Sequence, residues 1–563
     1  MVRKIWHFFY TNLLGREARS INQAAFLLGL FSLLSQIVGL MRDRFLAHIF
    51  GAGQELDIYY AAFRVPDFLF VTVASVVSLS VLIPFIIEKE HAGREELRRF
   101  IDSIFTFFGI VMTLAAVGAY LLMPSLAHVL FTGFAPDVLE RIVFMSRLLL
   151  WSPIILGFSN LFGSLTQAYN RFTIYAVAPI LYNVGILVGI MCFASEWGIL
   201  AAVGGVLLGA VMHLCIQVPF VWKDGLMPRV TGEPSLRLVE KVAKISLPRT
   251  LTLSMSALTF IFLTALASRM AEGSVSIIAL SNNLQTISLS LIGVSYSLAA
   301  FPTLTRRFQE KNIPAFLEQM QVTTRFIVFW SLPLTALLVV LRAQVVRVLL
   351  GSGLFDWPAT RLTAAALALF VLSSVFQSLL LLLMRGFYSA GFTKKPFYIN
   401  LFSTAALVLL TYGLVDLFNS SVIFSSFIGT LLKVDDLGNG VMLMLPLGFS
   451  LGTILNGILL WYFFEREFPG YSKAVWRTWF EGVAASVVMG AVAYAGLNYF
   501  SSLFALDTLL NIFLQGLLAG LVGIAAGILV LKMLKSPELA SVLQVVHSKF
   551  WRTKVIATDP EIV

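Results

Sequence analysis

The sequence predicts an all-α protein that crosses a membrane many times, and three observations support this fold class. Of its 563 residues, 58% are hydrophobic and only 12% are charged, whereas a soluble domain averages about 25% charged residues. Apolar runs of about 20 residues, the length at which a helix spans a bilayer, follow one another along the chain. Short motifs also recur at a nearly constant offset. The low charge excludes a soluble enzyme, a disordered chain and a nucleic-acid-binding domain.

About fourteen apolar runs are long enough to be transmembrane helices. The segments between them are too short to form a soluble domain. The first run is longer than the h-region of a signal peptide, so we expect it to be an uncleaved helix. In chain order the expected spans are 22–47, 58–87, 100–123, 142–166, 174–195, 199–222, 246–268, 275–304, 322–341, 361–384, 397–418, 441–464, 478–500 and 508–533.

The basic residues predict the orientation of these spans, because Lys and Arg are retained on the cytoplasmic side of a membrane. With a cytoplasmic N-terminus, most of the 40 Lys and Arg residues fall in cytoplasmic segments. We therefore expect both termini to be cytoplasmic, and the net charge of +10 reflects topology rather than a nucleic-acid partner. The loops on the opposite side carry Arg269, Arg342, Arg347, Arg361 and Lys433.

Repeated motifs divide the chain into two similar halves. Pro84 recurs as Pro302, and the pattern P-x-x-x-N that starts at Pro179 recurs at Pro396. The offset corresponds to six spans, an even number, so the two copies share one orientation, as in transporters with parallel repeats. The predicted organisation is a cytoplasmic segment 1–21, an N-lobe 22–222, a linker 223–245, a C-lobe 246–464, a C-terminal helix pair 478–533 and a cytoplasmic tail 534–563.

The candidate functional residues lie in the first helical hairpin, which is formed by the first two expected spans. Ionisable residues at membrane depth are costly and are by default candidates for function. Arginine forks bind two phosphate oxygens at once, so Arg42 and Arg64 in a wet cavity suit a pyrophosphate, and Asp57 could hold one of them until substrate binds. Arg44 and Asp67 are read instead as charges that reach the outer interface. The charged residues of the hairpin are Arg42, Asp43, Arg44, Asp57, Arg64 and Asp67.

Weaker candidates are Gln36, one to two turns before Arg42, and the adjacent amides Asn282 and Asn283, which could contact substrate or join helices. The two cysteines and six histidines form no metal motif, so we expect neither a metal nor a cofactor. The sequence holds no P-loop and no catalytic triad. These observations favour a transporter that is not an enzyme and is not driven directly by ATP.

The hairpin resembles that of the MurJ (MviN) lipid II flippases, members of the multidrug/oligosaccharidyl-lipid/polysaccharide exporter superfamily. Residues 35–43 read SQIVGLMRD, 49–53 read IFGAG and 62–67 read AFRVPD. Residues 170–183 (NRFTIYAVAPILYN) and 385–388 (RGFY) match further family patterns. The resemblance covers about residues 22–535.

This resemblance implies a flippase that moves an undecaprenyl-pyrophosphate-linked peptidoglycan precursor from the cytoplasmic to the periplasmic leaflet of the bacterial inner membrane by alternating access. It implies that Arg42 is a cavity arginine and that Arg64 and Asp57 match the basic and acidic family positions. Its partners would be the lipid-linked glycan, membrane lipid and a coupling ion, sodium or proton, and we expect a monomer.

At several cavity positions the chain departs from the family pattern. Gln36 and Phe70 stand where the family has arginines, and Asn282 and Asn283 stand where it has an Asp-Arg pair. The sequence therefore leaves three alternatives open: a flippase for another polyprenyl-linked glycan or lipid, a drug or cation antiporter of the same superfamily, and a non-transporting scaffold.

Overall fold

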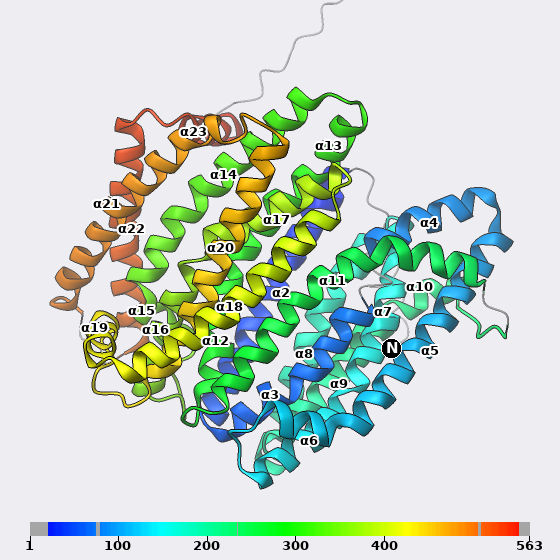
Figure 1. Ribbon diagram of the computed structural model, residues 1–563, viewed down its shortest axis with the longest axis horizontal. Coiled ribbons are helices and arrows are strands. Elements are labelled where there is room, and N and C mark those ends of the chain that lie inside the picture. Colours follow the sequence, from blue (N-terminus) through cyan, green and yellow to red (C-terminus); the bar gives the residue numbers. More distant parts are fainter. Residues whose placement is uncertain (1–20, 75–78, 233–234, 505–507, 551–563) are drawn as a thin grey trace, which may run out of the picture. The chain divides into compact units, whose positions relative to one another are not determined.

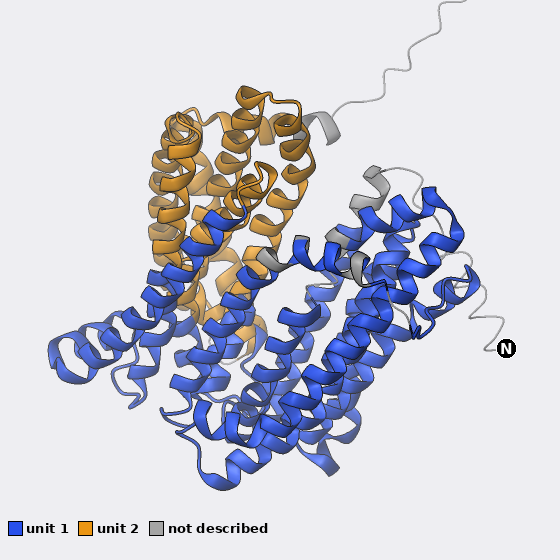
Figure 2. Ribbon diagram, turned by 45° about the vertical axis from the view of Figure 1, so that its right-hand side comes forward, with its two compact units in different colours: residues 1–284, 349–366, 393–452 blue, residues 285–348, 367–392, 453–563 orange. Residues whose placement is uncertain are grey.

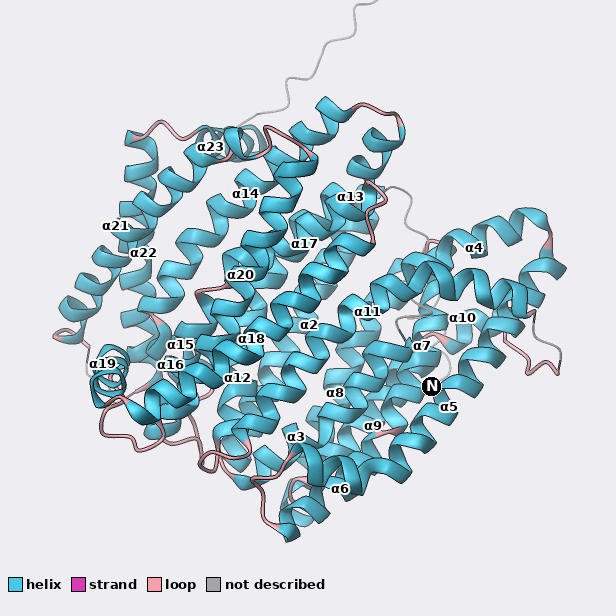
Figure 3. Cartoon of the chain, in the orientation of Figure 1, coloured by secondary structure: helices cyan, strands magenta, loops and turns pink. Residues whose placement is uncertain are grey.

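The structure is a computed structural model that describes residues 21–74, 79–232, 235–504 and 508–550. Within these residues every regular element is helical (Figure 3). Eleven described helices are long and apolar enough to cross a membrane, or twelve if one bent pair counts as a single span. This confirms the all-α polytopic fold class and is compatible with the fourteen expected spans, each of which overlaps a helix. The expected segment 1–21, apart from Ile21, and the tail beyond 550 lie outside the described residues.

The helices follow one another with short connections (Figure 1). The first part of the chain forms α2 (Ile21–Phe50), α3 (Gln54–Leu69), η2 (Phe70–Ala74), α4 (Leu79–Ala92), α5 (Arg94–Leu130), α6 (Pro136–Leu149), α7 (Trp151–Ala168), α8 (Phe172–Trp197), α9 (Leu200–Cys215), α10 (Val218–Lys223) and α11 (Leu236–Ala267). The remainder forms α12 (Ser274–Leu289), η3 (Ser290–Val294), α13 (Ser295–Gln309), α14 (Ile313–Val340), α15 (Arg342–Leu349), α16 (Trp357–Val371), α17 (Ser374–Ser389), α18 (Lys394–Ser420), α19 (Val422–Leu432), η4 (Gly440–Leu443), α20 (Met444–Glu467), η5 (Ser472–Ala474), α21 (Trp476–Ser501), α22 (Leu509–Met533) and α23 (Pro537–Phe550).

The chain packs into two compact units (Figure 2). Unit 1 comprises Met1–Leu284, Leu349–Ala366 and Thr393–Gly452, and unit 2 comprises Gln285–Val348, Leu367–Phe392 and Thr453–Val563. These units interleave along the sequence, whereas the expected lobes 22–222 and 246–464 follow one another. The lobe boundaries therefore stay a prediction from the repeated motifs.

The internal repeat is visible in the local helix geometry. Helix α3 has 16 residues and runs directly into the five-residue π-helix η2, and α12 likewise has 16 residues and runs into the five-residue π-helix η3. Pro66 lies inside α3 and does not end it; the helix widens four residues later, at Phe70. Such π-helical turns are frequent at functional sites.

The repeated P-x-x-x-N motif makes the same hydrogen bond in both copies. The Asn183 side-chain amide donates to the Pro179 carbonyl at 3.1 Å, and the Asn400 amide donates to the Pro396 carbonyl at 2.8 Å. Each amide thereby donates one of its two N–H groups to a backbone carbonyl one turn earlier in the same apolar helix. The motif is thus a local device for placing a polar side chain in a membrane-spanning helix.

In unit 1, α8 and α9 approach closely through glycines spaced four residues apart. A Cβ atom on Gly185 would lie 2.3 Å from the Gly209 Cα atom, and one on Gly205 would lie 2.8 Å from the Ile186 Cα atom. Small residues at this spacing let helix backbones pack directly where lipid offers no hydrophobic driving force. Gly204 faces away, with open space around its Cα atom.

In unit 2, aromatic rings fill the interior. Phe316 lies 5.1 Å from Phe468 and Phe464 lies 4.9 Å from Tyr471 between ring centroids. The Tyr471 hydroxyl is buried and lies 2.6 Å from the Thr324 hydroxyl, so its polar group is satisfied.

The α8–α9 contact makes a testable prediction. Gly205→Leu should lower the free energy of unfolding by about 1–3 kcal/mol because the new side chain overpacks the helix contact. Gly204→Leu, one residue away, should leave it nearly unchanged. Thermal unfolding of both variants in detergent measures the difference, and equal melting temperatures would show that this contact does not stabilise the protein.

Candidate functional site

Polar side chains of α2, α3, α8 and α12 meet around a cavity of about 220 Å³ in unit 1. Of the residues expected from the sequence, Arg42, Arg64, Asn282 and Asn283 all line it. The other lining residues are Leu46, Tyr59, Tyr60, Phe63, Asp67, Tyr182, Ile186 and Ala279. We call this space the polar cavity.

Arg42 is held at the polar cavity by a hydrogen-bond network that joins three helices. Its Nε and Nη2 atoms donate to Asp43 Oδ1 at 2.9 and 2.7 Å, and its Nη1 atom donates to Asn183 Oδ1 at 3.0 Å. Asn283 donates to the other Asp43 oxygen at 3.1 Å. The Asp43 side chain is only 5% exposed. A buried carboxylate of this kind costs stability unless it is paired and hydrogen-bonded, and here it is both.

Arg64 is oriented by α11. Its Nε atom donates to Thr264 Oγ1 at 2.7 Å, and its guanidinium carbon lies 5.7 Å from the centroid of the Phe260 ring. The second contact has cation–π geometry. Together these contacts hold the guanidinium group against α11, and Arg64 lines the polar cavity.

Asp57 occupies a place that differs from the expected one. Both of its oxygens accept backbone N–H groups at the start of α12, from Gly273 at 2.7 Å and from Ser276 at 2.7 Å, and the residue is 2% exposed. The expected pairing of Asp57 with Arg42 or Arg64 is therefore wrong for this structure. A carboxylate at a helix N-terminus is stabilised by unpaired amides and by the helix dipole, which explains why Asp57 binds there.

Gln36 and the hairpin turn complete the set of expected residues. Gln36 lies on α2 outside the set that lines the polar cavity, and its Oε1 atom is buried without a hydrogen-bond partner in the described structure. In the turn, Gly51 has a φ of 65° and a Cβ atom there would lie 2.8 Å from the Leu354 carbonyl oxygen, so this position requires glycine. Gly53 is extended, with a φ of −138°.

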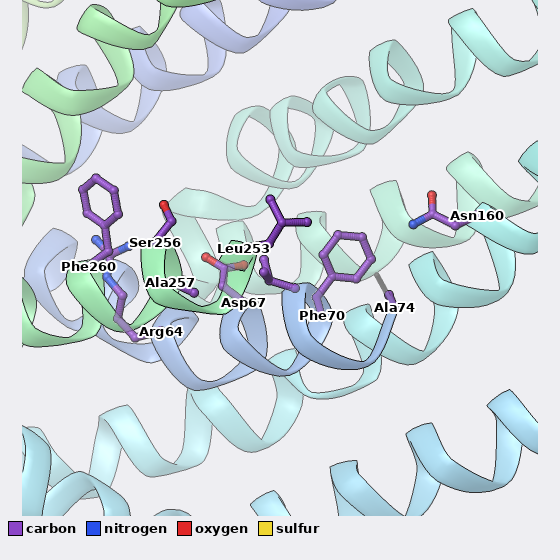
Figure 4. Close-up of a pocket in the computed structure, with 10 residues that line it drawn as sticks. Arg64, Asp67, Phe70, Ala74, Asn160, Leu253, Ser256, Ala257 and Phe260 are labelled. Carbon is purple, nitrogen blue, oxygen red and sulfur yellow. The ribbon is translucent and has the colours of Figure 1, made fainter. Parts of the chain in front are cut away.

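A second and larger cavity of about 470 Å³ adjoins the first in unit 1, because Arg64 and Asp67 line both. Figure 4 shows its polar and aromatic side chains extending into one space from α3, η2, α7 and α11. We call this space the aromatic cavity. Its lining residues are Arg64, Asp67, Phe70, Val71, Ala74, Asn160, Leu253, Ser256, Ala257 and Phe260.

Several residues of the site are not identified by the sequence. Asn183 is visible in the sequence only as part of a repeated motif, and the interface interpretation of Asp67 misses that it lines both cavities. Tyr59, Tyr60 and Thr264 carry no signal of their own in the sequence. In an apolar helix, an aromatic or hydroxyl residue that lines a site cannot be distinguished from one that packs in the core until its neighbours are known.

Comparison with known families matches residues 46–515 to the family described as Lipid II flippase MurJ. A "Probable lipid II flippase MurJ" of Thermotoga maritima is 26% identical over 523 residues, which cover 92% of this chain and 98% of that protein. A "Lipid II flippase MurJ" of Burkholderia cenocepacia is 24% identical over 480 residues, covering 83% and 89%.

Solved structures share the fold. A structure titled "Lipid II flippase MurJ, inward closed conformation" matches with a TM-score of 0.71 and 20% identity, covering 92% of this chain and all of that one. An inward-facing multidrug resistance MATE family transporter matches with a TM-score of 0.63 and 14% identity over 80% of this chain and 99% of its own. At these identities the likeness supports the fold alone.

The capping contact of Asp57 predicts a stability effect. Asp57→Ala should lower the free energy of unfolding by about 1–3 kcal/mol, because two buried amides lose their acceptor, and Asp57→Asn should cost less since one oxygen remains. Glu55→Ala is a matched control on the same helix: Glu55 pairs with Arg141 at 2.6 Å but is 41% exposed, so its loss should cost under about 1 kcal/mol. Melting temperatures in detergent compare the three variants, and a Glu55 effect as large as that of Asp57 would contradict the capping role.

Proposed function

We propose that this chain, which belongs to the Lipid II flippase MurJ family, moves lipid II from the cytoplasmic to the periplasmic leaflet by alternating access. The single observation that carries the proposal for the site is that Arg42 and Arg64, on consecutive helices of the first hairpin, line one cavity. The two guanidinium groups are suited to the pyrophosphate that links the glycan to its lipid.

The network around Arg42 leaves donors for a phosphate. A guanidinium has five N–H donors, and the contacts to Asp43 and Asn183 use the Nε group and one N–H on each Nη atom. One N–H therefore remains on Nη1 and one on Nη2. Tyr60 also lines the cavity, and its buried hydroxyl has no hydrogen-bond partner in the described structure.

Further proposals concern the location, oligomeric state and topology of this protein. We propose a multi-pass transporter of the bacterial cytoplasmic membrane, not an enzyme, that acts as a monomer with both termini in the cytoplasm. The asymmetry of Lys and Arg between alternate loops supports this orientation.

A multidrug or cation antiporter is the second candidate, since MATE transporters share the fold. A cationic substrate would meet Arg42 and Arg64 in the polar cavity. Of the carboxylates that such an antiporter could use, Asp57 already accepts two backbone amides and Asp43 pairs with Arg42. Asp67 lines the polar cavity beside both arginines. These contacts favour an anionic substrate over a cationic one.

Genetic rescue tests the function. In a bacterium depleted of its own lipid II flippase, expression of this chain should restore growth. Arg42→Ala combined with Arg64→Ala should abolish rescue, because the proposed pyrophosphate site loses both guanidinium groups, and the assay is colony survival at matched membrane expression.

Arg44→Ala provides the matched control, because Arg44 lies on the same hairpin but does not line either cavity. It should rescue as the unmodified chain does. Survival of the double variant would disprove the phosphate site. Failure of the unmodified chain to rescue would favour a flippase for another polyprenyl-linked glycan or a non-transporting role.

For the driving force, we propose a cation gradient of sodium or protons. In vesicles containing the purified protein, flipping of lipid II should accelerate under one of the two gradients and slow when a selective ionophore dissipates it. Equal rates under both gradients and without either would contradict coupling to these ions.

A further inference from the structure

The aromatic cavity is built from two helix faces that oppose each other. On one side lie Asp67, Phe70, Val71 and Ala74, and on α11 lie Leu253, Ser256, Ala257 and Phe260. Both sets follow the spacing i, i+3, i+4 and i+7, which places their members on one side of a helix. The cavity therefore lies between a face formed by α3 and η2 and a face of α11.

Polar and aromatic side chains both line the aromatic cavity. Across the view of Figure 4, Arg64 with Phe260, then Asp67, then Phe70, then Asn160 follow one another, and the Asn160 amide points toward the same space as the Phe70 ring. Hydrogen-bonding side chains and two aromatic rings thus share one lining, whose other members are aliphatic.

A lining that combines polar, aromatic and aliphatic side chains suits a molecule with polar edges and apolar faces. A pyranose ring has that form, with hydroxyl groups at its rim and C–H groups on its faces. The electron-rich face of an aromatic ring attracts such C–H groups, while a carboxylate, an amide and a hydroxyl bind the rim. A hydrocarbon chain in this space would leave Asp67 and Asn160 facing apolar atoms, which costs free energy for each unpaired polar group.

The position of the cavity fits the order of groups in a lipid-linked glycan. Arg64 and Asp67 line both cavities, so a ligand with phosphates in the polar cavity continues past these two residues into the aromatic one. The volume of about 470 Å³ falls in the usual range for small-molecule sites, about 300–1,000 Å³.

We propose that the aromatic cavity is a sugar subsite, which binds the sugar ring next to the pyrophosphate, and that Phe70 is its specificity-determining residue. This inference rests on the proposed flippase function, because that function supplies the phosphate that anchors the ligand in the polar cavity. Phe70 is the first residue of η2 and lines the aromatic cavity but not the polar cavity.

Two lipids that differ in one sugar test the proposal: a polyprenyl pyrophosphate, and the same lipid carrying one N-acetylhexosamine on its terminal phosphate. Binding of each to the purified full-length protein in detergent is measured by native mass spectrometry. The unmodified protein should bind the sugar-bearing lipid about tenfold more tightly. Phe70→Leu, which keeps an apolar side chain without a ring face, should reduce this preference to about twofold or less and leave the affinity for the sugar-free lipid unchanged.

Controls separate the possible failures. Phe68→Leu, two residues earlier on α3 and outside both cavity linings, should retain the full preference. A preference that persists in Phe70→Leu, or an equal loss of affinity for both lipids, would overturn the role of Phe70. If the unmodified protein binds both lipids equally, the sugar subsite is wrong while the flippase proposal stands. If it binds neither lipid, the proposed function itself fails, and the subsite fails with it.

Discussion

An ionised side chain among membrane-spanning helices is stable only when its charge and its hydrogen-bonding atoms find partners within the bundle. The first hairpin is organised around this constraint. Arg42 donates to Asp43 and to Asn183, and Asn283 donates to the remaining Asp43 oxygen. The network therefore ties α2 to α8 and to α12, and the position of each helix depends on the others.

The same constraint decides what Asp57 does. A buried carboxylate needs donors, and the unpaired amides at the start of α12 supply two of them at 2.7 Å. The contact fixes α3 against α12. In the turn before α3, Gly51 has a left-handed conformation, which lets the loop lie against the Leu354 carbonyl. One end of the hairpin is thus held by structural contacts, while Arg42 and Arg64 are held where they line a cavity.

Two charged residues are shared by the polar cavity and the aromatic cavity. Arg64 and Asp67 line both, so a single turn of α3 connects a space suited to phosphate with one walled by aromatic rings. The π-helix that follows α3 recurs after α12, so the repeat preserves an irregularity of the backbone as well as the positions of prolines. Because a π-helix occurs at the same place in both halves, we attribute it to the shared geometry of the repeat rather than to chance.

The sequence by itself determined the fold class, the approximate positions of the spans and the choice of Arg42 and Arg64 as candidate site residues, because apolar runs and charges at membrane depth are properties of neighbouring residues. It also showed the P-x-x-x-N repeat, whose hydrogen bond is local. Only the tertiary structure decided that Asp57 binds α12 and that Asn183, 141 residues from Arg42, completes its network. Asn283 lies 240 residues from Asp43. Such pairings depend on which helix faces meet, and no local pattern in the chain records that.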